Sequence, residues 1–210
     1  MRVTYLFDPL CGWCYGAHPA LEELTRRDDV ALELVPTGLF AGEGARAMDA
    51  QFAAYAWQND ERIARLTGQP FSEIYRTHVL GKTGGMFDSA PATLGLVAVR
   101  VTEPTREFEA LKAIQHARYV DGRDIGSLPE VGDILQSIGV PAAAERVRTP
   151  DDELTLAYRR QIEAARSEMQ RFGVSGVPAL LVGDGAERRL LRGNLLFGRF
   201  DLLVSQLQAA

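Results

Sequence analysis

The two cysteines of the chain, Cys11 and Cys14, have the most distinctive chemistry in the sequence. They are the only cysteines among 210 residues, and they have C-x-x-C spacing in the segment Cys11-Gly12-Trp13-Cys14. Two thiols at this spacing can close a small disulfide or supply two ligands to a metal ion. An apolar run over residues 3–7 precedes the pair and a helical pattern follows it. A strand that leads into a helix beginning at the first cysteine favours redox chemistry.

The expected position at a helix N-terminus assigns a role to each cysteine. Unpaired backbone N–H groups at that end stabilise an anion, and the thiolate is the form of cysteine that attacks disulfides. We therefore expect Cys11 to be the nucleophile that forms a mixed disulfide, and Cys14, one turn further on, to be the resolving thiol. Trp13 either offers apolar surface to a substrate or packs into the core, and the sequence supports both interpretations equally.

The composition is that of an ordinary globular chain. Hydrophobic residues make up 46% and charged residues 24% of the sequence, which allows a packed core. The formal net charge is −5 and basic residues form no long run, so nucleic-acid binding is not expected. No stretch reaches the roughly 18 apolar residues of a membrane span, and no secretory signal precedes Cys11. If the chain starts at its natural start, these features predict a cytoplasmic protein.

Hydrophobic periodicity predicts mixed structure at both ends of the chain. Near the N-terminus it predicts a strand over 2–7, a helix over 14–27 with a kink at Pro19, and a parallel strand over 30–35. Near the C-terminus it predicts a long helix that stops at Gly173. The remaining C-terminal elements are a hairpin and a closing helix, at residues 179–182, 188–191 and 199–207.

The middle of the chain is predicted to be helical. Apolar residues recur there at helical spacing, and about a hundred residues contain no convincing strand. The expected helices cover residues 49–66, 71–80, 89–101, 106–119 and 128–138.

This order of elements resembles the thioredoxin fold with a helical insertion, as in the FrnE-like branch of the DsbA family of thiol-disulfide oxidoreductases. The segments that carry the resemblance are residues 8–16, 119–125 and 172–179. The resemblance implies an α/β protein, with a thioredoxin-like fold and an inserted all-α domain. Residues 1–40 and 151–210 are then the thioredoxin-like domain, and residues 41–150 are the helical insertion.

The resemblance also implies a substrate site beside the cysteines. The family's proline matches Pro178, which implies a cis Val177-Pro178 bond next to the sulfurs. Val177, Pro178 and Trp13 are the expected substrate-binding residues, with an extended substrate pairing to the backbone of Val177.

Three residues near the cysteines need a separate interpretation. Tyr5 stands six residues before Cys11, where thioredoxin-like proteins often carry a buried acid. Asp8 and His18 are candidate modulators of the thiols. An Asp-Pro turn is the alternative role for Asp8, and simple packing is the alternative for His18.

The predicted function is that of a thiol-disulfide oxidoreductase or isomerase, acting on protein disulfides or on small thiols. We expect no tightly bound cofactor and no metal, with glutathione as a candidate co-substrate. The direction of electron flow and the oligomeric state stay open.

Two alternative functions must account for the same sequence features. A glutathione-dependent enzyme of the kappa transferase or 2-hydroxychromene-2-carboxylate isomerase type resembles this architecture. Those enzymes use a serine at the active position, and the intact Cys11 and Cys14 count against them. A zinc-binding module would need four ligands, and His18, His78 and His116 are scattered.

Overall fold

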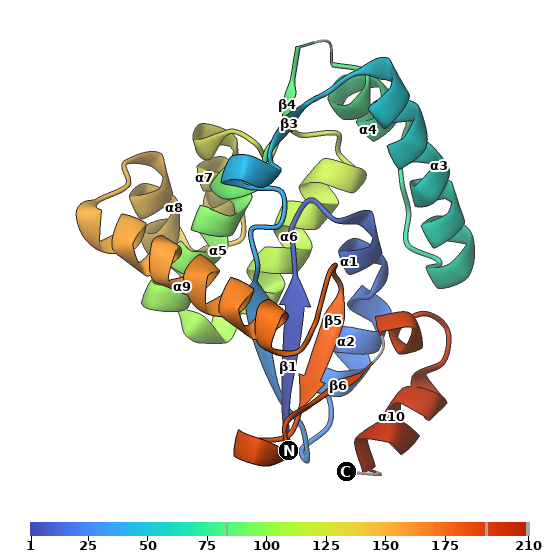
Figure 1. Ribbon diagram of the computed structural model, residues 1–210. Coiled ribbons are helices and arrows are strands. Elements are labelled where there is room, and N and C mark those ends of the chain that lie inside the picture. Colours follow the sequence, from blue (N-terminus) through green and yellow to red (C-terminus); the bar gives the residue numbers. More distant parts are fainter. Residues whose placement is uncertain (83, 192, 209–210) are drawn as a thin grey trace.

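A four-stranded mixed sheet forms the centre of the computed structural model, which describes residues 1–82, 84–191 and 193–208 (Figure 1). The strand order is β2-β1-β5-β6. Strands β1 (Arg2–Phe7) and β2 (Ala31–Pro36) are parallel, whereas β5 (Ala179–Val182) is antiparallel to both β1 and β6 (Arg189–Leu191). The structure thus confirms the predicted strand–helix–strand start and the predicted C-terminal hairpin.

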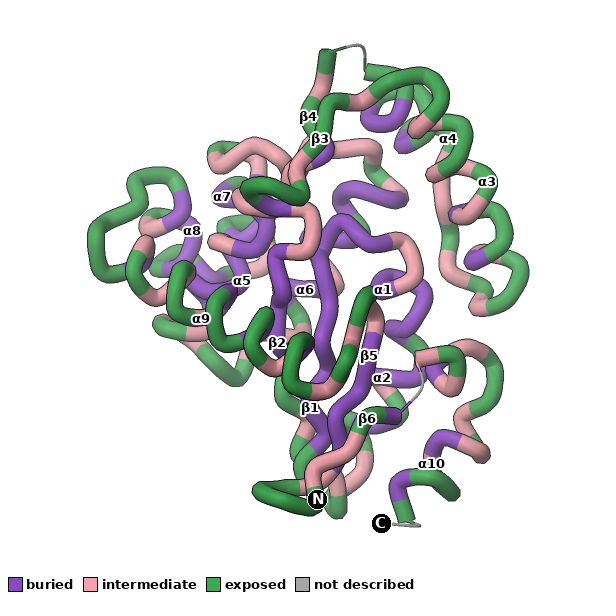
Figure 2. Tube along the Cα trace, viewed as in Figure 1, coloured by how far each residue is buried: buried purple, intermediate pink, exposed green. Residues whose placement is uncertain are grey.

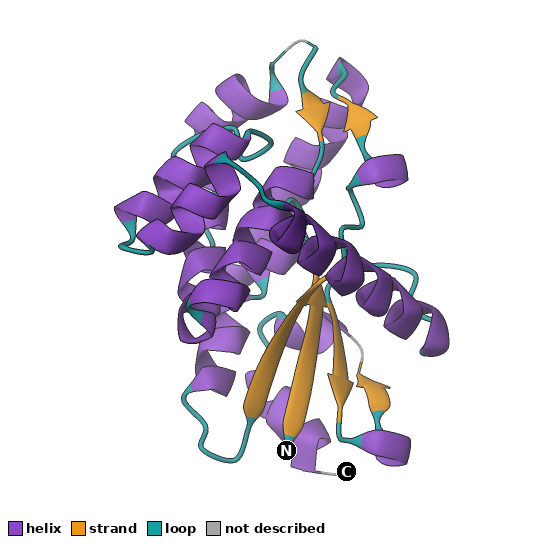
Figure 3. Ribbon diagram, turned by 90° about the vertical axis from the view of Figure 1, so that its left-hand side faces the viewer, coloured by secondary structure: helices purple, strands orange, loops and turns teal. Residues whose placement is uncertain are grey.

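Alternating side chains of the central strands face two different layers of helices. On one face Val3, Tyr5 and Phe7 belong to the main core, which also contains residues of α2 (His18–Thr25) and α10 (Phe200–Gln208). On the other face Leu6 packs with residues of α9 (Asp152–Arg171), which crosses the sheet obliquely (Figure 3). The alternating side chains of β1 therefore contribute to two hydrophobic cores, one on each face of the sheet.

The helix after β1 is split at Ala17. Its first part, α1 (Gly12–Gly16), begins directly after Cys11, as expected from the cysteine pair, and two residues before the start at residue 14 that the periodicity gave. The second part, α2, has Pro19 in its first turn. Proline has no backbone N–H to donate to the preceding turn, so the predicted interruption of the helix is present, at Ala17 rather than at Pro19 itself.

Residues 41–150, the predicted helical insertion, contain all the predicted helices of the middle region. Its helical segments are α3 (Ala50–Thr67), α4 (Glu73–Tyr75) with the π-helical turn η2 (Arg76–Leu80), α5 (Ala90–Thr102), α6 (Glu107–Tyr119), α7 (Leu128–Ser137) and α8 (Pro141–Arg148). Helix α8 was not predicted. The insertion also holds a two-stranded ladder of β3 (Arg46–Ala47) and β4 (Met86–Phe87), where no strand was expected (Figure 3).

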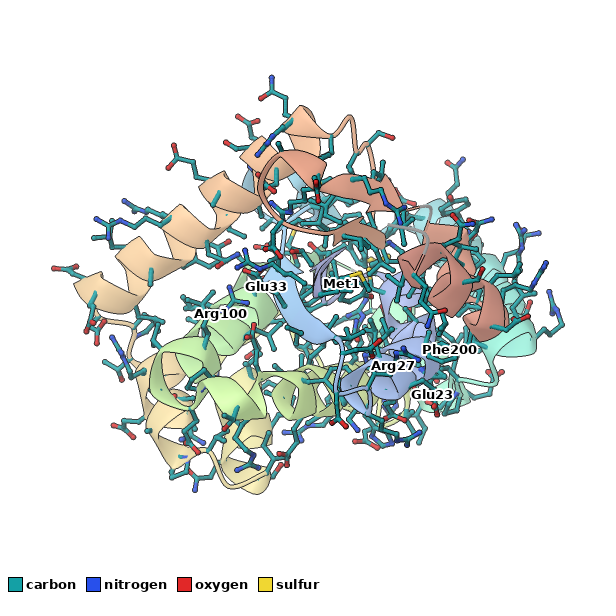
Figure 4. The ribbon with its side chains drawn as sticks, turned by 90° about the horizontal axis from the view of Figure 1, so that it is seen from below. Met1, Glu23, Arg27, Glu33, Arg100 and Phe200 are labelled. Carbon is teal, nitrogen blue, oxygen red and sulfur yellow. The ribbon has the colours of Figure 1, made fainter. Side chains whose placement is uncertain are left out.

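The insertion packs directly against the sheet and shares its core. Seen from below (Figure 4), Arg100 of α5 lies beside the edge strand β2, where its guanidinium donates to the Leu34 carbonyl. The same guanidinium pairs with Glu107 at 2.7 Å. Strand β1 from Val3 onwards and the second half of α1, from Cys14 to Gly16, are buried (Figure 2). The division into two domains at residues 40 and 150 stays a prediction. Among the described helices, none combines the length and apolarity needed to span a bilayer.

Candidate active site

Cys11 occupies the N-cap position of α1. Its backbone is extended there, with φ −83° and ψ 115°, and its side chain makes no capping hydrogen bond. The residue is 8% exposed, and both cysteines are free thiols. The first N–H groups of a helix have no partner within the helix and stabilise negative charge. Cys11 therefore lies at the end of α1 that carries these unpaired N–H groups.

The segment Val177-Pro178 faces Cys11 from the other end of the chain. The Val177–Pro178 peptide bond is cis, as the resemblance implied. The Cys11 thiol donates to the carbonyl oxygen of Val177, with Sγ and O 3.6 Å apart. In Figure 1 the loop between α9 and β5 reaches the start of α1. The structure brings these predicted site residues together, and their roles in substrate binding stay a prediction.

Cys14 is more deeply buried, at 1% exposure. Burial raises the pKa of its thiol well above the ordinary value, and the adjacent Cys11 thiol raises it further. Cys14 therefore keeps its proton while Cys11 is the thiol within reach of a substrate. Below it, the buried Tyr5 hydroxyl donates to the Cys14 carbonyl at 3.1 Å. Burial also raises the pKa of Tyr5, so its hydroxyl acts as a neutral donor.

Helix α6 of the insertion holds the loop that precedes Cys11. Gln115 Nε2 donates to the carbonyl of Pro9 at 3.0 Å, and the Tyr119 hydroxyl donates to the carbonyl of Leu10 at 2.8 Å. Both side chains are buried. Buried carbonyl groups need partners, so these two bonds fix the loop that places Cys11 at its helix terminus.

Asp8 joins three segments of the chain beneath the same loop. It is fully buried, and its carboxylate accepts hydrogen bonds from Leu10 N at 2.9 Å, Phe40 N at 3.0 Å and Ser89 Oγ at 2.8 Å. Burial raises the pKa of Asp8, against the lowering effect of these bonds. The bond to Leu10 N closes the turn that the sequence predicted for Asp8, and a modulating role stays a prediction. Ser89 is the N-cap residue of α5 (Ala90–Thr102), and its hydroxyl donates to Asp8 rather than capping that helix.

Trp13 is half-buried and fits both of its expected roles in part. One side of its ring packs edge-on against Phe197, with centroids 5.0 Å apart. The Arg62 guanidinium lies 5.6 Å from the ring centroid. A positive charge over an indole ring is a favourable contact. The remaining exposed part of Trp13 is available to a substrate.

His18 is buried between aromatic rings. It packs edge-on against Tyr15 and Phe108, with centroid distances of 5.3 and 6.0 Å. Burial lowers the pKa of His18 to about 4. The imidazole is therefore neutral near pH 7, and any modulation of the thiols by His18 stays a prediction.

The neutral state of His18 predicts a specific loss of stability in acid. An unfolded histidine has a pKa near 6.5, so protons bind the unfolded chain more tightly than the folded one. His18 should contribute its full stability above about pH 6.5 and lose it as the pH falls towards about 4, up to about 3 kcal/mol. In His18→Phe this loss should be absent, as urea denaturation at several pH values would show. The exposed His116→Phe variant is the control. An identical acid response in His18→Phe and the unaltered protein would contradict the assignment.

Asp60, Gln115 and Tyr119 were not among the residues that the sequence predicted for the site. Asp60 is a buried acid on α3, beside the active-site helix. Its signal was present, because it lies between Ala56 and Ile63 on the apolar face of its helix. Tyr119 and Gln115 bond to backbone carbonyls, which no sequence motif marks.

No group of three or more His, Cys, Asp or Glu side chains among the described residues is arranged to hold a metal ion.

The model of the DSBA-like thioredoxin domain family matches residues 2–208. The chain belongs to the DsbA-like thioredoxin family. Membership makes it a thiol-disulfide oxidoreductase, with the α/β thioredoxin fold expected from the sequence. Assignment of this DsbA-like protein to the FrnE-like branch stays a prediction. A comparison with curated proteins gave no match.

Solved structures agree with this membership. The cytosolic disulfide reductase DsbM from Pseudomonas aeruginosa is 30% identical, with a TM-score of 0.85 and 100% of both chains covered. The same DsbM has been solved with GSH, and that structure has a TM-score of 0.84. A proposed protein disulfide isomerase from Nitrosomonas europaea is 25% identical over 98% of both chains, with a TM-score of 0.78.

The likeness to a 2-hydroxychromene-2-carboxylate isomerase is weaker. That structure has a TM-score of 0.63 at 16% identity and covers 100% of this chain and 95% of its own. At this identity it shows a shared fold alone.

Proposed function

We propose that this DsbA-like protein is a disulfide reductase that passes electrons from glutathione to disulfides through Cys11 and Cys14. The observation that carries the proposal is the position of Cys11, at a helix N-terminus with Sγ 3.6 Å from the Val177 carbonyl. The likeness to DsbM, a cytosolic disulfide reductase that has been solved with GSH, supports the direction, the co-substrate and a cytoplasmic location.

The proposed reaction has two exchange steps. The Cys11 thiolate attacks one sulfur of a substrate disulfide, which forms a Cys11–substrate disulfide and releases the other sulfur as a thiolate. Cys14 then loses its proton and attacks Cys11 Sγ, which closes the Cys11–Cys14 disulfide and releases the second substrate thiolate. Two electrons pass to the substrate. Two molecules of glutathione restore the dithiol and leave as glutathione disulfide.

The proposed substrate groove lies between Trp13 and the Val177-Pro178 segment. The half-buried state of Val177 and Pro178 leaves backbone groups that an extended substrate can approach. On the other side, Arg62 adds a positive charge next to Trp13. This charge suits the carboxylates of glutathione.

A coupled assay tests the proposal. The protein is given glutathione and a peptide with one disulfide, and glutathione disulfide is followed through glutathione reductase and NADPH. We expect turnover that depends on both glutathione and the peptide disulfide. Oxidation of a dithiol peptide with no reduction of the disulfide peptide would show that the protein works in the opposite direction.

A further inference from the structure

A buried carboxylate of the insertion lies against the active-site helix. Asp60 of α3 is 4% exposed. Gly12, between the two cysteines, touches it so closely that a Cβ at this position would collide with Asp60 Oδ1 and lie 3.2 Å from Ile63 Cδ1. Gly12 is the first residue of α1 after the N-cap Cys11. One oxygen of Asp60 is therefore held beside the helix end that would stabilise a Cys11 thiolate.

Groups from two other elements hold Asp60 in place. The Tyr75 hydroxyl of α4 donates to Asp60 Oδ2 at 2.9 Å. From α6 come the buried Arg118, whose guanidinium lies 5.5 Å from the Tyr75 ring centroid, and Tyr119, whose ring centroid is 5.0 Å from that of Tyr75. Tyr119 also bonds to Leu10, next to Cys11. The cluster thus connects Asp60 with the active-site loop through buried side chains.

Asp60 is the carboxyl of this cluster, and it changes charge near neutral pH. Burial raises the pKa of Asp60 to about 7, although the Tyr75 hydrogen bond and the charge of Arg118 lower it. Burial raises the pKa values of Tyr75 and Tyr119 well above the ordinary value, so both stay neutral. From α1 the residue against Asp60 is Gly12, between the two cysteines, and the neighbours of Asp60 on α3, Glu61 and Arg62, are exposed.

We propose that Asp60 is a positioning residue that makes the Cys11–Cys14 pair a stronger reductant, because its ionised carboxylate opposes the negative charge of the Cys11 thiolate. This inference rests on the proposed function. The equilibrium concerned is protein dithiol plus glutathione disulfide, giving protein disulfide plus two glutathione. Two electrons and two protons move from the protein to glutathione. The protein disulfide carries no charge, so a nearby carboxylate destabilises only the reduced side and drives the equilibrium towards oxidation of the protein.

The test is the equilibrium constant of this reaction in Asp60→Asn, measured by mass spectrometry of the trapped thiols at several pH values. At about pH 8.5 we expect the equilibrium constant to fall about tenfold. For a two-electron couple this fall corresponds to a change of about 30 mV in the reduction potential of the cysteine pair. At about pH 5.5 Asp60 is protonated in the unaltered protein, so the two constants should agree. Glu61→Gln removes a charge one residue away on the exposed side and should leave the constant unchanged.

A second variant keeps the test open if Asp60→Asn does not fold. Tyr75→Phe removes the hydrogen bond that favours the carboxylate, so Asp60 should ionise at a higher pH. This variant should be less reducing than the unaltered protein near neutral pH and equal to it at about pH 5.5. A purely structural role would give no such pH dependence.

The outcomes separate the two proposals. The role of Asp60 would be overturned, with the proposed function left intact, by either of two results. In one, the equilibrium constants of Asp60→Asn and the unaltered protein are equal at about pH 8.5. In the other, the two constants differ by the same factor at every pH. Failure of Cys11 and Cys14 to exchange with glutathione in any variant would overturn the proposed function, and the role of Asp60 with it.

Discussion

Replacing Cys11 with serine is expected to abolish thiol-disulfide exchange, with a loss of rate of at least about a thousandfold. A serine hydroxyl does not ionise near neutral pH, and its oxygen cannot form the mixed disulfide. Cys14 cannot replace Cys11, because it is 1% exposed and burial raises the pKa of its thiol. The rate is measured by reduction of a peptide disulfide in a single turnover. The fold should persist, since serine is close to cysteine in size, and circular dichroism checks this.

Cys14→Ser is the matched variant, and it should stop the reaction one step later. Cys11 still attacks, but no second thiol lies within reach to resolve the product. With glutathione disulfide and no free glutathione, the protein should gain the mass of one glutathione at Cys11 and hold it. Closure of the Cys11–Cys14 disulfide in the unaltered protein should leave no such adduct. A Cys14→Ser protein that releases its adduct as fast as the unaltered one would contradict the resolving role of Cys14.

The two ends of the chain could be predicted because their signals are local. A short apolar run over residues 3–7, rich in β-branched and aromatic side chains, indicates a buried strand. The C-x-x-C pair is also a local signal, and it marks the start of a helix. By contrast, Val177 lies 166 residues from Cys11, and only the family resemblance connected the two.

Contacts between the insertion and the active site could not be predicted from local patterns. Gln115 and Tyr119 bind the carbonyls of Pro9 and Leu10, and a carbonyl group is the same whatever the residue. Asp60 was visible as an acid on an apolar helix face. Its position against Gly12 depends on how α3 packs on α1, and neither helix specifies that by itself.

The elements that were not predicted are short. Strands β3 and β4 have two residues each, too few for a period of two to be recognised. Helix α8 has eight residues and starts at Pro141, which the periodicity alone reads as a break. Proline is well tolerated in the first turn of a helix, because the N–H it lacks would have no partner there.

Asp8→Ala is expected to lower the free energy of unfolding by about 3 to 5 kcal/mol. The substitution leaves the N–H groups of Leu10 and Phe40 and the Ser89 hydroxyl without their common acceptor in a buried place. Since these donors belong to the active-site loop, the segment after β2 and the start of α5, three parts of the molecule should loosen together. Urea denaturation measures the effect.

Ser89→Ala is the control for Asp8→Ala, because it removes one donor and leaves the other two bonds to Asp8 in place. It should cost about 1 kcal/mol, in keeping with a single hydrogen bond. If Asp8→Ala costs no more than Ser89→Ala, the carboxylate does not join the three segments. If Asp8→Ala instead slows thiol-disulfide exchange by Cys11 strongly and changes the free energy of unfolding only a little, that result would support the modulating role predicted for Asp8. The Leu10 bond then matters most, because Leu10 directly precedes Cys11.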